Sequence, residues 1–349
     1  MSKASTAILI KSRAKYGKRL TSHDYDELLN CQTVADISMY LKNNTHYNVT
    51  LEKFREASVH RGNLEQLLKS KIYSDFAQLS KFERSIGEHL FEYLLLKSEI
   101  DQLLSYLRHY ISNTTEKVLF QLPNFFVEHS KLDFNRMIEA KSFEDILNLL
   151  KGTDYYSLLK PFNAKSRDTV DFTTIESVLD RYLYQKAMRG INKYYSGAER
   201  EQLIDFFSTS AEIDNIRKIY RAKAYFNITE SKLQSQLNNL SSKLTKNQFS
   251  ALMNCETATD VMQTLKNTQY GKYINKHDFV FFDELATRMK YHYCRRMMRY
   301  STNSSVVLIS TVTVFETEVE NITNIIEGKR YGVDNENIKK LLILERAVN

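Results

Sequence analysis

Eight histidines, three cysteines and many carboxylates are the side chains of this sequence that could do catalytic or metal-binding chemistry. The cysteines Cys31, Cys255 and Cys294 form no CxxC pair, and no histidines show HExxH or zinc-finger spacing. The phosphate-binding motifs GxxxxGK[ST] and GxGxxG and the nucleophile motif GxSxG do not occur in the sequence either. We therefore predict no catalytic residues, no cofactor and no metal site, and expect reduced, partly buried thiols.

Three aspartates stand at the same place in a phrase that occurs three times, and they are the first candidates for acid–base chemistry. The phrases are TVADISMYLKNNTHY (33–47), SFEDILNLLKGTDYY (142–156) and TATDVMQTLKNTQY (257–270), with Asp36, Asp145 and Asp260. A serine or threonine precedes each aspartate by three residues, which is the spacing of a helix capping box. The pattern predicts a capped amphipathic helix each time, ended by Gly152, Asn43 or Asn267 with positive φ.

Three glutamates, Glu99, Glu212 and Glu318, form a second series. Each is followed by an aliphatic residue, an acid and an amide, and each is expected near the start of a helix. Three related carboxylates could line a shared axis as walls of a central cavity. The alternative is three independent acids that cap helix starts or form salt bridges.

The recurring phrases keep one order and nearly one spacing along the chain. The aspartate series recurs after 109 and 115 residues, and the glutamate series after 113 and 106. A third series, Glu65, Glu176 and Asp283, each followed eight residues later by a tyrosine, recurs after 111 and 107. The sequence therefore predicts three similar domains, at residues 1–122, 123–240 and 241–349.

Helices are expected to position these residues. The 349 residues contain only two prolines and nine glycines, too few for the turns of a sheet protein. VVLISTVTVF (306–315) has strand propensity, but the repeat aligns it with a helical segment at 83–99, so we predict a helix. It is too short for a membrane span, and we expect an all-α protein that is soluble and cytoplasmic.

The formal net charge is +7, which raises the possibility of nucleic-acid binding. The basic excess is spread over all three predicted domains, and a basic cluster on a helix is usually a solvated surface. The densest cluster lies in KSRAKYGKR (11–19), where we expect an N-terminal helix to meet an acidic partner surface. Its candidate contact residues are Lys11, Arg13, Lys15, Lys18 and Arg19.

A unit of about 110 residues exceeds the 20–50 residues of solenoid repeats, so each copy is expected to be a small helical domain. Three like domains that associate head to tail form a ring if the rotation closes. The predicted architecture is thus all-α, with pseudo-threefold symmetry and a central depression.

The stretch KSRAKYGKRLTSHDYDELLNCQTVADISMYLK (11–42) resembles the opening of the C subunit family of V/A-type rotary ATPases, called d in the eukaryotic V-ATPase. The threefold phrases fit that family, and the resemblance covers essentially the whole chain. It implies a non-catalytic funnel of three helical domains on the cytoplasmic face of the membrane rotor ring of proteolipid subunits. Its cavity would receive the central shaft of subunits D and F, and torque would pass through it between ATP hydrolysis or synthesis and H⁺ or Na⁺ transport.

The expected partners are therefore the shaft and the ring, with membrane contact only through the complex and no nucleic acid. The alternative is a helical scaffold or nucleic-acid-binding protein that uses its positive charge, and it predicts salt-dependent binding to DNA or RNA. An enzyme is the third possibility.

Overall fold

The computed structural model describes residues 3–52, 61–80, 84–114, 129–225, 229–240, 243–274 and 281–344. Over these residues the chain forms eighteen α-helices and two short 3-10 helices, with no strand. The all-α prediction is confirmed. None of the helices in the described part is long and apolar enough to cross a membrane.

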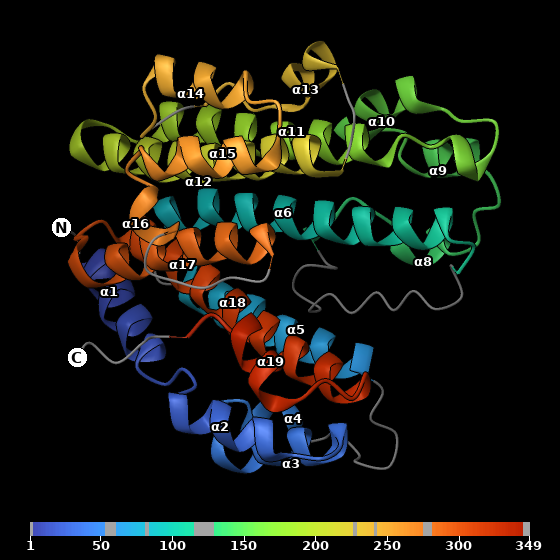
Figure 1. Cartoon of the computed structure of the whole chain (residues 1–349). Coiled ribbons are helices and arrows are strands. Elements are labelled where there is room, and N and C mark those ends of the chain that lie inside the picture. Colours follow the sequence, from blue (N-terminus) through green and yellow to red (C-terminus); the bar gives the residue numbers. More distant parts are fainter. Residues whose placement is uncertain are drawn as a thin grey trace.

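Each copy of the repeat contributes a set of short helices followed by two long ones (Figure 1). The first copy contains α1 (Lys3–Tyr16), α2 (Ser22–Asn30), α3 (Val34–Asn44), α4 (Asn48–Leu51), α5 (Arg61–Ser80) and α6 (Arg84–Ile111). The second contains α8 (Phe134–Met137), α9 (Phe143–Leu149), α10 (Asp154–Leu159), η3 (Lys160–Phe162), η4 (Arg167–Thr169), α11 (Phe172–Tyr194), α12 (Gly197–Tyr225) and α13 (Glu230–Gln236). The third contains α14 (Lys246–Met253), α15 (Ala258–Lys266), α16 (Gly271–Ile274), α17 (Phe282–Tyr300), α18 (Ser304–Arg330) and α19 (Asn335–Leu341).

The three aspartates of the first series begin helices, as predicted. Thr33, Ser142 and Thr257 each accept a hydrogen bond from the backbone N–H of the aspartate three residues later, and that aspartate accepts one from the N-cap backbone. Hydrogen bonds to each carboxylate, first from the N-cap side chain and then from the N-cap backbone, lower the pKa of Asp36, Asp145 and Asp260. The aspartates are helix-start residues, exposed at Asp145 and Asp260 and half-buried at Asp36.

The ends of these helices follow the prediction in one copy only. Gly152 has φ +84°, as expected. Asn43 lies inside α3 and Asn267 has φ −87°, so the predicted positive φ is wrong at both asparagines. In all three copies a threonine hydroxyl donates to a leucine carbonyl oxygen at the end of the helix: Thr45 to Leu41, Thr153 to Leu150 and Thr268 to Leu265.

The six long helices contact one another in a closed cycle. Within the copies, α5 packs on α6, α11 on α12 and α17 on α18; between the copies, α6 packs on α11, α12 on α17 and α18 on α5. The short helices lie outside this group, with α2–α4, α8–α10 and α14–α16 in three separate places (Figure 1). The pairing of α18 with α5 joins the third copy to the first.

Helix α18 confirms the prediction for residues 306–315. Residues Val306, Val307, Leu308 and Ile309 are all nearly or fully buried. A helix that is apolar on all sides needs protein around it, and α1, α5, α12 and α17 surround α18. Burial on all sides explains why β-branched residues are tolerated in this helix.

Over the described residues, three large apolar clusters and one small cluster (Leu9, Met298 and Val307) form the core. Two of the large clusters lie to the outside, and each of these uses residues of two neighbouring copies. One combines the C-terminal half of α6 with α8–α10 and the start of α11. Another combines the C-terminal half of α12 with α13–α16 and the start of α17. The largest contains α2–α5 and α18 together with central parts of the other long helices. The units that pack together are therefore not the sequence copies, because each outer cluster combines the end of one copy with the beginning of the next. The predicted domain boundary at 122/123 lies outside the described residues.

Candidate functional site

The second series of acids is found at the junctions between copies. Glu99, Glu212 and Glu318 are 7%, 0% and 4% exposed, and all three lie near the middle of a long helix. The expectation that they lie near helix starts is wrong. The repeat identified equivalent residues correctly, but an apolar stretch before each glutamate turned out to be the first half of the same helix.

Each glutamate accepts hydrogen bonds from the beginning of the next copy. Glu212 accepts from the backbone N–H groups of Lys243 (2.9 Å) and Leu244 (3.1 Å) and from the hydroxyl of Tyr270 (2.7 Å). Glu99 accepts from Ser130 Oγ (2.6 Å), the N–H of Lys131 (3.3 Å) and the hydroxyl of Tyr155 (2.8 Å). A buried carboxylate with several donors of this kind joins two segments firmly.

Glu318 makes the same joint from the third copy to the first. Its Oε2 accepts from the N–H of Leu20 (2.6 Å), and its Oε1 accepts from the hydroxyl of Tyr47 (2.9 Å). His46 Nε2 lies 2.7 Å from Oε1. Leu20 and Tyr47 correspond to Leu244 and Tyr270 of the third copy, so one contact occurs three times and closes the cycle.

The tyrosines of these joints belong to the recurring phrase and follow its threonine (Thr45, Thr153 or Thr268) by two residues. Burial, and then the charge of the neighbouring glutamate, raises the pKa of Tyr47, Tyr155 and Tyr270 well above the ordinary tyrosine value. All three therefore stay protonated and can donate to the carboxylate. The tyrosine of the recurring phrase and the repeated glutamate are thus hydrogen-bonded to each other in all three copies.

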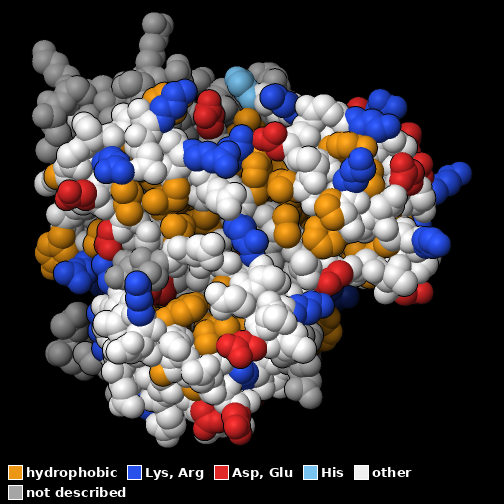
Figure 2. Space-filling model, turned by 90° about the horizontal axis from the view of Figure 1, so that it is seen from above, with side chains coloured by type: hydrophobic (Ala, Val, Ile, Leu, Met, Phe, Trp, Pro, Cys, Tyr) orange, Lys and Arg blue, Asp and Glu red, His pale blue; other side chains and the backbone are white. Residues whose placement is uncertain are grey.

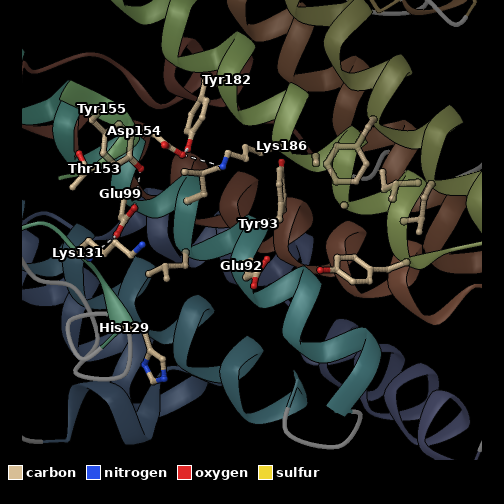
Figure 3. A pocket seen from close by; sticks show the side chains of 18 of the residues that line it. Glu92, Tyr93, Glu99, His129, Lys131, Thr153, Asp154, Tyr155, Tyr182 and Lys186 are labelled. Atoms are coloured by element: carbon tan, nitrogen blue, oxygen red, sulfur yellow. Dashed lines mark hydrogen bonds and ion pairs between the residues drawn. The ribbon is translucent and has the colours of Figure 1, made fainter. Parts of the chain in front are cut away.

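A cavity of about 460 Å³ lies beside Glu99, between α6 and α11 (Figure 3). Tyr93, Tyr155 and Tyr182 face it from three helices (Figure 3). Asp154 at its rim forms an ion pair with Lys186 (2.9 Å) and accepts a hydrogen bond from the hydroxyl of Tyr182. Its size is that of a small-molecule site, but Glu99 and Asp154 already have donors, and we assign no ligand to it.

The acids two residues after the glutamates are not equally buried, and the sequence did not indicate them as candidate functional residues. Asp101 and Glu320 are exposed, yet burial raises the pKa of both carboxyls, with Lys97 opposing the shift at Asp101 and Arg217 at Glu320. Residues i and i+2 of a helix point in nearly opposite directions, and the acid that follows each glutamate was visible in the repeated phrase.

The third acid of that set, Asp214, is buried and has partners for its carboxylate. Its carboxylate accepts from the hydroxyl of Tyr184 (2.7 Å) and from Lys290 Nζ (2.7 Å), and Arg217 lies 3.1 Å away. Lys97 and Glu316 each lie two residues before a repeated glutamate, Glu99 and Glu318. Lys97 forms an ion pair with Glu316, which also accepts a hydrogen bond from the hydroxyl of Tyr73 (3.4 Å). Tyr73 and Tyr184 of the third sequence series therefore contact acids among the long helices.

The basic N-terminal residues have different roles. Arg13 donates to the carbonyl oxygens of Met298 (3.0 Å) and Ser301 (2.8 Å) at the end of α17. Lys15 pairs with Asp75 of α5 (2.9 Å). These two side chains fasten α1 to its neighbours.

Of the other three basic residues, Arg19 is half-buried. Arg19 donates to the carbonyl oxygen of Tyr16 (3.1 Å) and stacks on its ring at 4.1 Å. Lys11 and Lys18 are exposed. Lys11 and Lys18 are therefore accessible to a partner at the surface.

The face seen from above carries apolar patches along its middle with basic and acidic side chains interspersed around them (Figure 2). That face has mixed charge. Among the described residues, no group of three or more His, Cys, Asp or Glu side chains is arranged to hold a metal ion.

The sequence matches the family model described as ATP synthase (C/AC39) subunit over residues 11–341. The chain belongs to this family. The match includes nearly every element described above, from α1 to α19. The resemblance predicted from residues 11–42 is confirmed.

Relatives of this family match along almost the full chain. The C subunit of the A-type ATP synthase of Methanosphaera stadtmanae is 22% identical over 95% of this chain and 86% of its own length. The protein of the same name from Pyrococcus abyssi is 22% identical over 95% of this chain and 88% of its length. That from Methanosarcina mazei is 21% identical over 95% and 91%.

Proposed function

We propose that this chain is a non-catalytic adapter in the rotor of a V/A-type ATPase or ATP synthase. It links the central shaft of subunits D and F to the proteolipid ring, on the cytoplasmic face of the membrane, and transmits torque between ATP turnover and H⁺ or Na⁺ transport. The observation that carries the proposal is the family match over residues 11–341. A pseudo-threefold funnel with a central cavity is part of the proposal.

The internal joints support a mechanical role. Torque transmission needs a body that does not open under load, and a closed cycle of long helices provides one. Glu99, Glu212 and Glu318 join each copy to the next with charged hydrogen bonds. In this proposal they set the shape of the cavity wall, while the exposed acids Asp101 and Glu320 are placed to meet the partner.

The exposed lysines of the N-terminal region are the proposed contacts with an acidic surface of the complex. Charge reversal at Lys11 and Lys18 is expected to weaken assembly with the shaft and ring without unfolding the chain. The control is the double charge reversal of Lys151 and Lys165, which are exposed outside this region.

The test is reconstitution of the full complex with wild-type chain, K11E/K18E or K151E/K165E. The measurements are co-purification with ring and shaft and ATP-driven ion transport. The adapter role predicts that ion transport requires the chain while ATP hydrolysis by the catalytic head alone does not. Transport that proceeds equally without the chain would reject the role. Unchanged assembly of K11E/K18E would reject only the lysine assignment. Tight nucleic-acid binding with a steep salt dependence would favour the alternative scaffold function.

A further inference from the structure

A second cavity lies at the seam where the third copy meets the first. Its volume is about 420 Å³. The turn between α1 and α2 forms one wall, α17 another, and α18 with the segment after α19 forms the floor. A water molecule occupies about 30 Å³ in the liquid, so the cavity has room for a small organic ligand.

Three arginines line this cavity: Arg19 from the turn, and Arg295 and Arg299 from α17. Arg295 and Arg299 are four residues apart and share one face of the helix with Tyr291. Among the described residues of the lining, these three guanidinium groups stand against one carboxylate, that of Glu318. The net charge that the cavity offers to a ligand is therefore positive.

The walls would strengthen the attraction for an anion. Tyr25, Tyr291 and Val314 are buried and reduce the exposure of the site to water. Asn321 Nδ2 donates to the carbonyl oxygen of Ile343 (3.0 Å), and Asn321 Oδ1 accepts from the N–H of Ile343 (2.9 Å). These two bonds fix the floor of the cavity.

Arg295, the first of the two arginines on α17, is not shared by the other two copies. In the alignment of the three copies, Arg295 takes the place of Ala77 and Met188. Arg299 stands where the first copy has a lysine and the second an asparagine. The fold therefore does not require a cation at position 295, and the seam carries a positive charge there that the equivalent helices lack.

We propose that the seam cavity binds a phosphate-bearing anion. Guanidinium groups match phosphate oxygens in two-point hydrogen bonds, and three of them suit a multiply charged anion better than a single carboxylate. A ligand held by Arg19 on one side and by Arg295 and Arg299 on the other would bridge the first and third copies across their seam. The proposal concerns this cavity alone and does not rest on the adapter role.

The test is calorimetric titration of the full chain with inorganic pyrophosphate, at low ionic strength in buffer free of phosphate and sulfate. Wild-type protein is expected to bind one pyrophosphate per chain with a saturable isotherm. The variant R295M/R299N carries the residues of the second copy and is expected to lose at least tenfold in affinity. R296Q removes one charge from an exposed neighbour outside the cavity and is expected to change affinity less than twofold. Unchanged melting temperatures without ligand establish that the variants are folded.

A parallel flotation assay distinguishes free phosphates from lipid headgroups. It uses phosphatidylcholine vesicles that contain phosphatidic acid, or phosphatidylserine at matched charge. Binding to phosphatidic acid vesicles that R295M/R299N abolishes and R296Q retains, without binding of pyrophosphate, assigns the site to a headgroup. Absence of saturable binding to either probe overturns the proposal. An equal loss in R296Q overturns it as well, because net charge rather than the cavity would then explain the binding.

Discussion

At the scale of single residues, the repeated glutamates solve the problem of holding a charge away from water. A carboxylate in a protein interior is costly unless donors occupy its oxygens. Glu212 is fully buried and receives two backbone N–H groups and one tyrosine hydroxyl. The backbone donors belong to residues just before a helix start, so the same carboxylate also fixes the direction in which the next copy begins.

The first prediction concerns Glu212. In E212Q the new amide group must place an NH2 against N–H and O–H donors, so the unfolding free energy is expected to fall by about 2–3 kcal/mol. In Y270F the carboxylate keeps its two backbone donors, and the expected loss is about 1–2 kcal/mol. Urea unfolding followed by circular dichroism measures both. A loss in E212Q no larger than that in Y270F would contradict the view that the backbone bonds carry the joint.

The second prediction concerns pH and Asp214. Burial raises the pKa of Asp214, but Lys290 and Arg217 outweigh burial and hold the pKa well below the ordinary value. A lowered folded pKa means that the carboxylate stabilises the fold above its unfolded pKa of about 3.9, and that this contribution is lost as pH falls further. D214N is therefore expected to lose about 2–3 kcal/mol at pH 7, because the cations then lack their partner.

Stability curves between pH 7 and pH 2.5 give the measurement for Asp214. The difference between wild type and D214N should be constant from pH 7 to about pH 5 and should shrink below about pH 4. The conservative variant Y184F removes one hydrogen bond and keeps the charge, so it serves as control. A difference between wild type and D214N that is independent of pH down to 2.5 would show that shape, and not charge, explains the loss.

At the scale of elements, the sequence predicted what depends on neighbours along the chain. The capping boxes at Thr33, Ser142 and Thr257 are local, and all three formed as expected. The positive φ expected at Asn43 and Asn267 is wrong, because asparagine adopts that conformation less readily than the glycine of the second copy.

Features that depend on distant segments could be located but not interpreted. Glu99, Glu212 and Glu318 were recognised as equivalent, yet their donors lie in another copy, which no local pattern reveals. The conformation of helix α18 also depends on distant segments. Its strand-like residues became helical because long helices surround it, and only the alignment with the other copies signalled this.

The third prediction tests the contact between α18 and α19. A Cβ at Gly328 would lie 2.4 Å from Cγ1 of Ile338, which is fully buried and β-branched. G328A is therefore expected to push α19 away and to cost about 1–3 kcal/mol, as overpacking usually does. G190A is the matched control, since nothing lies within 4 Å of its Cβ and the residue is inside α11.

For G190A we expect a gain of about 0.5–1 kcal/mol, because alanine favours a helix over glycine. The same chemical change should thus have opposite signs at the two positions. Thermal and urea unfolding of both variants decides the point. A neutral G328A would mean that α19 moves aside freely and that its packing on α18 contributes little.

At the scale of the whole molecule, the three joints differ in the length of chain that they close. Glu212 reaches residues that follow it by 31 and 32 positions, whereas Glu318 and Leu20 are separated by 298 positions. The cost of closing a loop grows with the logarithm of its length, at about 0.6 kcal/mol for each doubling. The seam between the third and first copies is therefore the place where the cycle opens most easily once its bonds are weakened.

The last prediction compares that seam with an internal joint by hydrogen exchange. E318Q removes the carboxylate that holds Leu20 and Tyr47, and we expect amide exchange in α2–α4 to become at least tenfold faster. E212Q makes the same chemical change at an internal joint, and its faster exchange should be confined to α14–α16. Both variants lose one buried charge, so charge alone cannot produce the difference in location. If E318Q accelerates α14–α16 as strongly as α2–α4, the molecule opens as one unit and the seam is not its weakest place. If exchange in α2–α4 stays at the wild-type rate, the packing of α18 on α5 closes the cycle without help from Glu318.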